Sequence, residues 1–257
     1  MKTKIKIPSN LYMKKRRQKI RKSLLIITFL LFPAVFYYLS PYLIIDGTLK
    51  GIISGSFIYF LLLFASALFF GRAYCGWVCP SSGVQDNISQ INDRKITKGN
   101  IIKWIIWIPW VSIIILLAVK NGGYTKIDPL YQTTYGLSIG NVYALITYLL
   151  VLALIVIPAF VIGRRSFCHS LCWMAPFMII GRKLRNLLKF PSLQLISNSE
   201  KCTNCHTCTT NCPMSLPVEI MVNNKEMEHC ECILCGTCVD GCNSNAIDFG
   251  FVRRPGY

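Results

Sequence analysis

The sequence predicts an α-helical membrane protein with four transmembrane helices, arranged as two repeated hairpins, followed by a small α+β domain. Three observations predict this fold class. Long apolar segments occupy the first two thirds of the 257-residue chain, whereas most of its 13 cysteines lie in the last third. A cysteine pair recurs with an offset of 93 residues, which separates Cys75 from Cys168 and Cys79 from Cys172. Near the C-terminus, two runs of four cysteines share one spacing.

Residues 1–23 are predicted to form a basic tail beside a membrane. The formal net charge is +17, and ten of the 28 Lys and Arg residues precede the first apolar segment. An anionic inner leaflet attracts such a tail. We therefore expect membrane lipid, and not nucleic acid, as the partner of these charges.

Residues 24–172 are predicted to form the membrane domain, with spans at 24–45, 51–71, 101–119 and 142–163. About 20 residues, rising ~1.5 Å each, cross the ~30 Å hydrocarbon core. The first segment is expected to remain as a signal anchor because no small-residue cleavage site follows it. Lys103, at the edge of the third span, is expected to snorkel to the interface.

Aromatic residues cluster near the ends of the spans. An aromatic belt at the membrane interface explains them without a quinone pocket. The residues expected in this belt are Trp104, Trp107, Trp110, Tyr143 and Tyr148.

The distribution of Lys and Arg predicts the orientation. Ten lie in the N-terminal tail, five follow the second span and seven lie in residues 164–201, against only Lys50, Lys120 and Lys126 in the other two loops. The positive-inside rule therefore places both termini and the cysteine-rich tail in the cytoplasm. A reducing compartment is also where unpaired, metal-binding cysteines are expected.

The two C-x3-C pairs each follow an outward-to-inward span and indicate an internal repeat. Parallel repeats related by an axis along the membrane normal would bring the pairs face to face at the cytoplasmic edge. Four thiolates there can hold a [2Fe-2S] or [4Fe-4S] cluster or a tetrahedral zinc ion. Thiol redox exchange and an inert structural role are the alternatives. The possible third metal site consists of Cys75, Cys79, Cys168 and Cys172.

Residues 173–195 are predicted to join the membrane domain to the C-terminal domain. Basic residues alternate with apolar ones at helical spacing, which predicts an amphipathic helix lying on the inner membrane surface. Pro176 suits its first turn. The alternative is a linker helix packed on the C-terminal domain.

Residues 196–257 contain the C-x2-C-x2-C-x3-C spacing twice, which is the bacterial-ferredoxin signature of two [4Fe-4S] clusters. In this arrangement the fourth cysteine of each run ligates the cluster of the other run. The first expected ligand set is Cys202, Cys205, Cys208 and Cys242. The second is Cys232, Cys235, Cys238 and Cys212. Cys230 is expected to be a spare thiol, and His169 is the histidine with a possible coordinating role.

With these motifs, the chain resembles the four-span membrane polyferredoxin family, typified by the NapH-type membrane component of quinol dehydrogenases. The segment from Arg72 to Pro80 matches the family's first C-x3-C-P motif, whereas Trp173 stands where the second motif has Pro. The resemblance implies a bacterial or archaeal cytoplasmic membrane protein that passes electrons between the quinol pool and other redox proteins.

We therefore expect an iron–sulfur electron-transfer subunit of a quinol dehydrogenase or another oxidoreductase complex. A [4Fe-4S] cluster changes oxidation state by one electron while its thiolates hold still, and no catalytic triad, phosphate loop or carboxylate pair is evident. The alternative is an accessory protein for copper reduction, cofactor assembly or regulation, because soft thiolates favour Cu(I).

Overall fold

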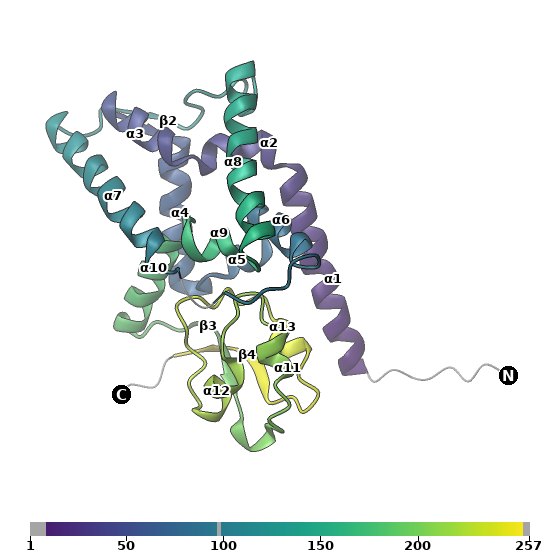
Figure 1. Ribbon diagram of the computed structural model, residues 1–257. Coiled ribbons are helices and arrows are strands. Elements are labelled where there is room, and N and C mark those ends of the chain that lie inside the picture. Colours follow the sequence, from purple (N-terminus) through teal and green to yellow (C-terminus); the bar gives the residue numbers. More distant parts are fainter. Residues whose placement is uncertain (1–8, 97–98, 254–257) are drawn as a thin grey trace.

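The computed structural model describes residues 9–96 and 99–253 and has two parts (Figure 1). A helical part forms one end of the molecule, and a small domain with a two-stranded sheet lies against its base. One continuous cluster of buried side chains runs from Phe32 in the helical part to Ile247 in the small domain. The two parts therefore share a core.

The first apolar segment is bent rather than straight. Its elements are α1 (Ser9–Leu30), α2 (Phe32–Val35), the 3-10 helix η1 (Phe36–Leu39) and α3 (Pro41–Leu49). The axis turns by 59° between Arg16–Leu30 and Phe32–Leu39. Pro33 explains the break, because proline has no backbone N–H to bond the preceding turn. Helix α1 also extends into the basic tail that the sequence separated from the first span.

Two helices in the described part of the chain are long and apolar enough to cross a membrane by themselves. These are α7 (Ile102–Lys120) and α8 (Val142–Val161). The bent pair in the first segment makes a third candidate if it counts as one span. Helix α4 (Gly55–Phe70), in the predicted second span, is apolar but has only 16 residues. The helix lengths alone therefore do not show four full-length spans.

Two short strands and two capped helices organise the end of the helical part that lies far from the small domain. Strand β1 (Ile52–Ser54) pairs in parallel with β2 (Lys126–Asp128), with Ile53 opposite Ile127. The Ser54 hydroxyl accepts from the amide of Phe57 and caps α4. The Asn141 side chain caps α8 in the same way, which satisfies amides that a helix start leaves free.

The predicted internal repeat is visible at the other end. Helix α4 leads into α5 (Ala73–Trp77) and α6 (Pro80–Ile88), and α8 leads into α9 (Ser166–Ser170) and α10 (Ala175–Leu188). Both α5 and α9 have five residues, and the first cysteine of each pair is the third of them. The same order of long helix, short helix and returning helix therefore carries both cysteine pairs.

The small domain contains a second repeat. Strands β3 (Ser192–Ser197) and β4 (Ile247–Val252) form its antiparallel sheet, with Leu195 opposite Phe249. Between the strands lie η2 (Ser199–Lys201), α11 (Thr207–Thr210), α12 (Val218–Asn223) and α13 (Thr237–Asp240). The backbone takes a positive φ at matching positions of the two cysteine runs: Asn204 and Leu234, His206 and Gly236, and Ser215 and Asn245.

Candidate iron–sulfur centre

Two cavities in the small domain each gather four cysteines from both runs. Cys202, Cys205, Cys208 and Cys242 line the first. Cys212, Cys232, Cys235 and Cys238 line the second. In each cavity, three cysteines of one run meet the last cysteine of the other, as the spacing predicts. No disulfide joins any of the 13 cysteines, all of which lie in the described residues, and Cys230 lines neither cavity.

The two cavities differ in their exposure to solvent. In the first cavity Cys205 is exposed, and Cys202, Cys208 and Cys242 are half-buried. In the second cavity each of the four cysteines is only 8% exposed. The first site can therefore meet a soluble partner, whereas the second is enclosed by protein.

The second cavity lies against the helical part. The indole Nε1 of Trp77 donates to the carbonyl of Leu234 at 2.9 Å, and Gln18 Nε2 donates to the carbonyl of Cys235 at 3.1 Å. A Cβ added to Gly76 would lie 2.3 Å from the carbonyl oxygen of Ile233. Only glycine permits this approach, so the first C-x3-C loop packs directly on the second cysteine run.

The four cysteines of the C-x3-C pairs come together at the base of the helical part. Their side chains are buried, at 5% exposure for Cys75, 2% for Cys79, 4% for Cys168 and 3% for Cys172. Members of the two pairs are close enough to interact electrostatically across the repeat. Burial raises the pKa of the Cys79 thiol to about 12 and also raises the pKa values of Cys168 and Cys172. Bare thiols there would be uncharged and unreactive.

Other side chains contact the sulfur atoms directly. Gln85, which is fully buried, donates from Nε2 to Cys168 Sγ at 3.2 Å. The Met178 sulfur lies 3.5 Å from Cys75 Sγ. Neither residue could be assigned to the site from the sequence, because each depends on how α6 and α10 pack.

Charged groups surround these cysteines. Arg72 pairs with Glu231 at 2.7 Å, and Lys103 pairs with the other oxygen of the same carboxylate at 2.5 Å. Burial alone would raise the pKa of Glu231, but the two cations lower it to about 2. The prediction that Lys103 snorkels to the interface is therefore wrong. Its side chain is fully buried because Glu231, far away in the sequence, supplies the counter-charge.

Asp86 joins a second pair of buried cations. Its carboxylate pairs with Arg21 at 2.9 Å and with Arg165 at 2.7 Å. Arg165 Nη1 also lies 3.3 Å from the carbonyl oxygen of Cys75. Asp86 therefore connects α1, α6 and the second C-x3-C loop.

His169 contacts the loop that precedes α7. Its Nδ1 lies 2.9 Å from Asn100 Oδ1, and its buried Nε2 has no hydrogen-bond partner in the described part of the chain. Burial, aided by nearby cations, lowers the pKa of His169 to about 4 despite the opposing charge of Glu231. The ring is therefore neutral at physiological pH.

Helix α10 packs two of its basic residues, Arg182 and Arg185, against the small domain. Arg182 pairs with Glu228 at 2.5 Å and donates to the carbonyl of Cys232 at 3.1 Å. Arg185 pairs with the same carboxylate at 3.1 Å. These two arginines contact the C-terminal domain, as the linker-helix alternative expects. The position of the helix on a membrane surface stays a prediction.

An apolar cavity of about 380 Å³ lies among α4, α7 and α10. Trp107 and Trp110 line it, and both pack edge-on against Phe177 with ring centroids 5.2 and 5.8 Å apart. Tyr148 is 8% exposed and packs against Phe32 and Phe36. The interfacial belt therefore does not explain these three residues, because they face the protein interior.

Comparisons with known proteins bear on both sets of cysteines. A family profile described as "4Fe-4S binding domain" matches residues 55–99 and 143–191, which contain the two C-x3-C pairs. A profile described as "4Fe-4S dicluster domain" matches residues 201–247, which contain both ferredoxin runs.

The chain belongs to the NapH-type family of membrane 4Fe-4S ferredoxins. It is 23% identical over 198 residues to the ferredoxin-type protein NapH of Haemophilus influenzae, which is 69% of this chain and 62% of that protein. It is 28% identical over 156 residues to the methylamine utilization ferredoxin-type protein MauN of Paracoccus denitrificans, 56% of this chain and 48% of MauN.

It is also 20% identical over 215 residues to YccM of Escherichia coli, 78% of this chain and 57% of YccM. The aligned region is thus less than two thirds of each of these three relatives. No solved structure matches the chain.

Together, the profiles and the cysteine-lined cavities identify a protein that binds 4Fe-4S clusters. The donor set fits this cofactor, because each cavity presents four thiols and thiolates are the usual ligands of [4Fe-4S] clusters. When bound, such a cluster supplies reversible one-electron chemistry. The chain's own residues position it, enclose it and set the charge around it.

Proposed function

We propose that the protein relays single electrons between a soluble partner and a partner in the membrane, through two [4Fe-4S] clusters in the small domain. The first cluster would be held by Cys202, Cys205, Cys208 and Cys242, and the second by Cys232, Cys235, Cys238 and Cys212. The graded burial of the two cavities is the observation that carries this proposal. An exposed site next to an enclosed site that abuts the helical part provides a direction for the route.

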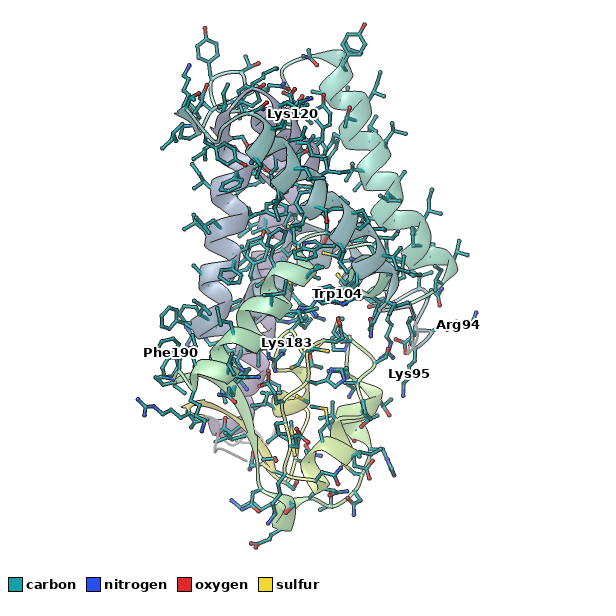
Figure 2. All side chains as sticks on the ribbon, turned by 90° about the vertical axis from the view of Figure 1, so that its left-hand side faces the viewer. Arg94, Lys95, Trp104, Lys120, Lys183 and Phe190 are labelled. Atoms are coloured by element: carbon teal, nitrogen blue, oxygen red, sulfur yellow. The ribbon has the colours of Figure 1, made fainter. Side chains whose placement is uncertain are left out.

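We infer that the small domain and both termini lie in the cytoplasm of a bacterium or archaeon, with a four-span domain in the cytoplasmic membrane. In this arrangement α4 and the bent first segment are the other two spans. Arg94, Lys95 and Lys183 gather near the small domain, and Lys120 lies at the far end (Figure 2). The Lys and Arg counts support the same orientation through the positive-inside rule.

A quinol is the membrane partner that the apolar cavity supports best. The cavity is lined by aromatic and aliphatic side chains of α4, α7 and α10. Phe177 lies in its wall, and the next residue, Met178, contacts Cys75. An apolar ring in this cavity would thus contact Phe177, whose neighbour Met178 touches the buried Cys75. The cavity would be the membrane end of the relay.

Copper reduction is the second candidate, and one contact favours it. The Met178 thioether lies 3.5 Å from the Cys75 thiol. Thioether and thiol sulfurs together suit Cu(I). In this alternative the buried cysteines handle a metal ion as substrate, and the ferredoxin clusters supply the electron.

A cavity-filling variant tests the quinol relay. Val111→Trp would fill part of the cavity wall, whereas Ile113→Trp adds the same bulk to a residue that is 46% exposed and outside the cavity. With anaerobic protein in nanodiscs, we expect Val111→Trp to slow cluster reduction by a short-chain quinol at least about tenfold, the effect of ~1.4 kcal/mol. Reduction by dithionite should stay unchanged, as should both reactions of Ile113→Trp.

Two results would contradict the quinol proposal. One is cluster reduction by quinol that proceeds equally fast in Val111→Trp and in the parent protein. The other is an absence of reduction by quinol in protein that dithionite reduces promptly. Conversion of Cu(II) to Cu(I) by the dithionite-reduced protein, lost in Met178→Leu, would then favour the copper alternative.

A further inference from the structure

We propose that Cys75, Cys79, Cys168 and Cys172 hold a third iron–sulfur cluster of the [4Fe-4S] type, between the membrane partner and the second ferredoxin cluster. This inference rests on the proposed relay and adds one cluster to it. The cluster would accept one electron and pass one on, with no bond made or broken.

The first argument for a shared cluster is the burial and the grouping of these cysteines. Each is at most 5% exposed, and the two pairs meet although 93 residues separate them in the chain. Equivalent short helices, α5 and α9, present Cys75 and Cys168 from the two halves of the repeat. Four thiols contributed in this symmetric way form a complete ligand set for one cluster.

The second argument for a cluster is the charge of the groups around the cysteines. Four buried cations, Arg21, Arg72, Lys103 and Arg165, share two carboxylates, Asp86 and Glu231. Each of the cations is at most 4% exposed. With neutral thiols this group has a surplus of positive charge, and an uncompensated buried charge is costly. A [4Fe-4S] core with four thiolates carries a net charge of about −2 and offsets that surplus.

Gln85 supplies a third, independent observation. Its side chain is fully buried, its Nε2 donates to Cys168 Sγ at 3.2 Å, and its Oε1 accepts from the amide of Phe167 at 3.2 Å. The second bond fixes the amide so that the donor faces sulfur. Hydrogen bonds to cluster sulfur atoms stabilise the reduced, more negative state and raise the reduction potential.

The position of the site completes the argument. Gly76 follows Cys75, and a Cβ there would lie 3.3 Å from the backbone of Cys235. Arg165 contacts the carbonyl of Cys75 and also interacts electrostatically with Cys235. The four-cysteine site therefore lies directly beside the second ferredoxin set, where an electron from the membrane would next arrive.

Iron analysis of the full chain tests the proposal. After anaerobic purification we expect about twelve iron and twelve sulfide per chain, the content of three [4Fe-4S] clusters. Cys75→Ser should lose about four of each and one signal in electron paramagnetic resonance. The two ferredoxin signals should persist and show that the variant has folded. Cys230→Ser, at an exposed cysteine outside all three sets, should keep all twelve.

A redox titration provides the second readout. Gln85→Leu should lower the midpoint potential of the third signal and leave the other two unchanged, whereas Gln90→Leu, at an exposed position, should shift none. About eight iron per chain, unchanged in Cys75→Ser, would overturn the proposal, and so would stoichiometric zinc bound at these cysteines. Iron content does not depend on quinol, so a failure of the proposed relay and a failure of this inference are separate results.

Discussion

At the scale of single residues, Glu231 joins the two parts of the molecule. It precedes Cys232 in the second ferredoxin run, yet its carboxylate pairs with Arg72 below α4 and with Lys103 at the start of α7. All three side chains are at most 3% exposed. Buried ion groups of this kind are stable only when they are complete, because each remaining charge would lack both water and a partner.

Replacing Glu231 by Gln is therefore expected to destabilise the protein strongly. The variant leaves Arg72 and Lys103 buried without a counter-charge, and removal of one partner from a buried ion pair costs about 3–5 kcal/mol. Thermal unfolding of the purified protein in detergent should show a clearly lower midpoint. Glu200→Gln, at an exposed carboxylate, is the matched control and should change stability by less than about 0.5 kcal/mol. Equal midpoints for the two variants would show that the group is not important for stability.

Residue types alone could not reveal these pairings. The sequence shows that Lys103 lies at the edge of an apolar segment, and snorkelling is what an unpaired lysine does there. Its partner is 128 residues away and has no periodic relation to it. Gln85 and Met178 were missed as neighbours of the cysteines for the same reason, since neither belongs to a spacing motif.

At the scale of elements, α10 connects the helical part to the small domain. Its glycine at position 181 packs so closely on α4 that a Cβ would lie 2.8 Å from the carbonyl oxygen of Phe64. The same helix carries Arg182 and Arg185, which pair with Glu228. Burial would raise the pKa of Glu228, but these arginines and Asn186 lower it to about 2. The carboxylate is thus charged at every physiological pH.

Loss of Arg182 should loosen the small domain from α10. Arg182→Gln removes the ion pair with Glu228 and the strong donors to the carbonyls of His229 and Cys232. Hydrogen bonds to charged groups contribute about 1.5–3 kcal/mol each, so the local opening equilibrium should shift by at least about tenfold. Hydrogen exchange of amides in residues 228–238 should accelerate accordingly. The exposed neighbour Lys183→Gln should leave it unchanged, and equal exchange in both variants would contradict the role of α10.

The helices themselves were predictable where their pattern is local. The predicted spans at 101–119 and 142–163 correspond to α7 (Ile102–Lys120) and α8 (Val142–Val161), because an apolar run of that length has few other stable structures. The first segment has the same composition but bends at Pro33, and the second is shortened by strand β1. Hydropathy detects neither the bend nor the strand, because the residues around Pro33 and those of β1 are mostly apolar.

At the scale of the whole molecule, the cysteine sites lie near the boundary between the two parts. The first C-x3-C loop packs through Gly76 on the run that lines the enclosed cavity, and Met178, next to Phe177 in the wall of the apolar cavity, contacts Cys75. The small domain lies under the base of the helical part, on the side of α5, α9 and α10 (Figure 1). This arrangement fits the proposed relay of electrons between a soluble partner and a partner in the membrane.

The orientation in the membrane can be tested with cysteine labelling. Cys230 is exposed on the small domain, and Tyr135, which is 100% exposed, lies in the loop between α7 and α8. A membrane-impermeant maleimide should label Cys230 in inverted vesicles and not in intact spheroplasts, because the small domain is expected in the cytoplasm. In a Tyr135→Cys, Cys230→Ser protein the pattern should reverse. Labelling of Cys230 from outside would refute the proposed topology.

The sequence by itself determined the class of cofactor and the membrane character, because both follow from local information. A C-x2-C-x2-C-x3-C run specifies its ligands through spacing, and an apolar segment specifies its environment through length. It also predicted that the C-x3-C pairs repeat. Only the tertiary structure decided that these pairs lie beside the second ferredoxin run, which carboxylates pair with the buried cations, and that Trp107 and Trp110 of α7 line a cavity. Each of these depends on contacts between residues far apart in the chain, and the packing of the helices, not any spacing, brings them together.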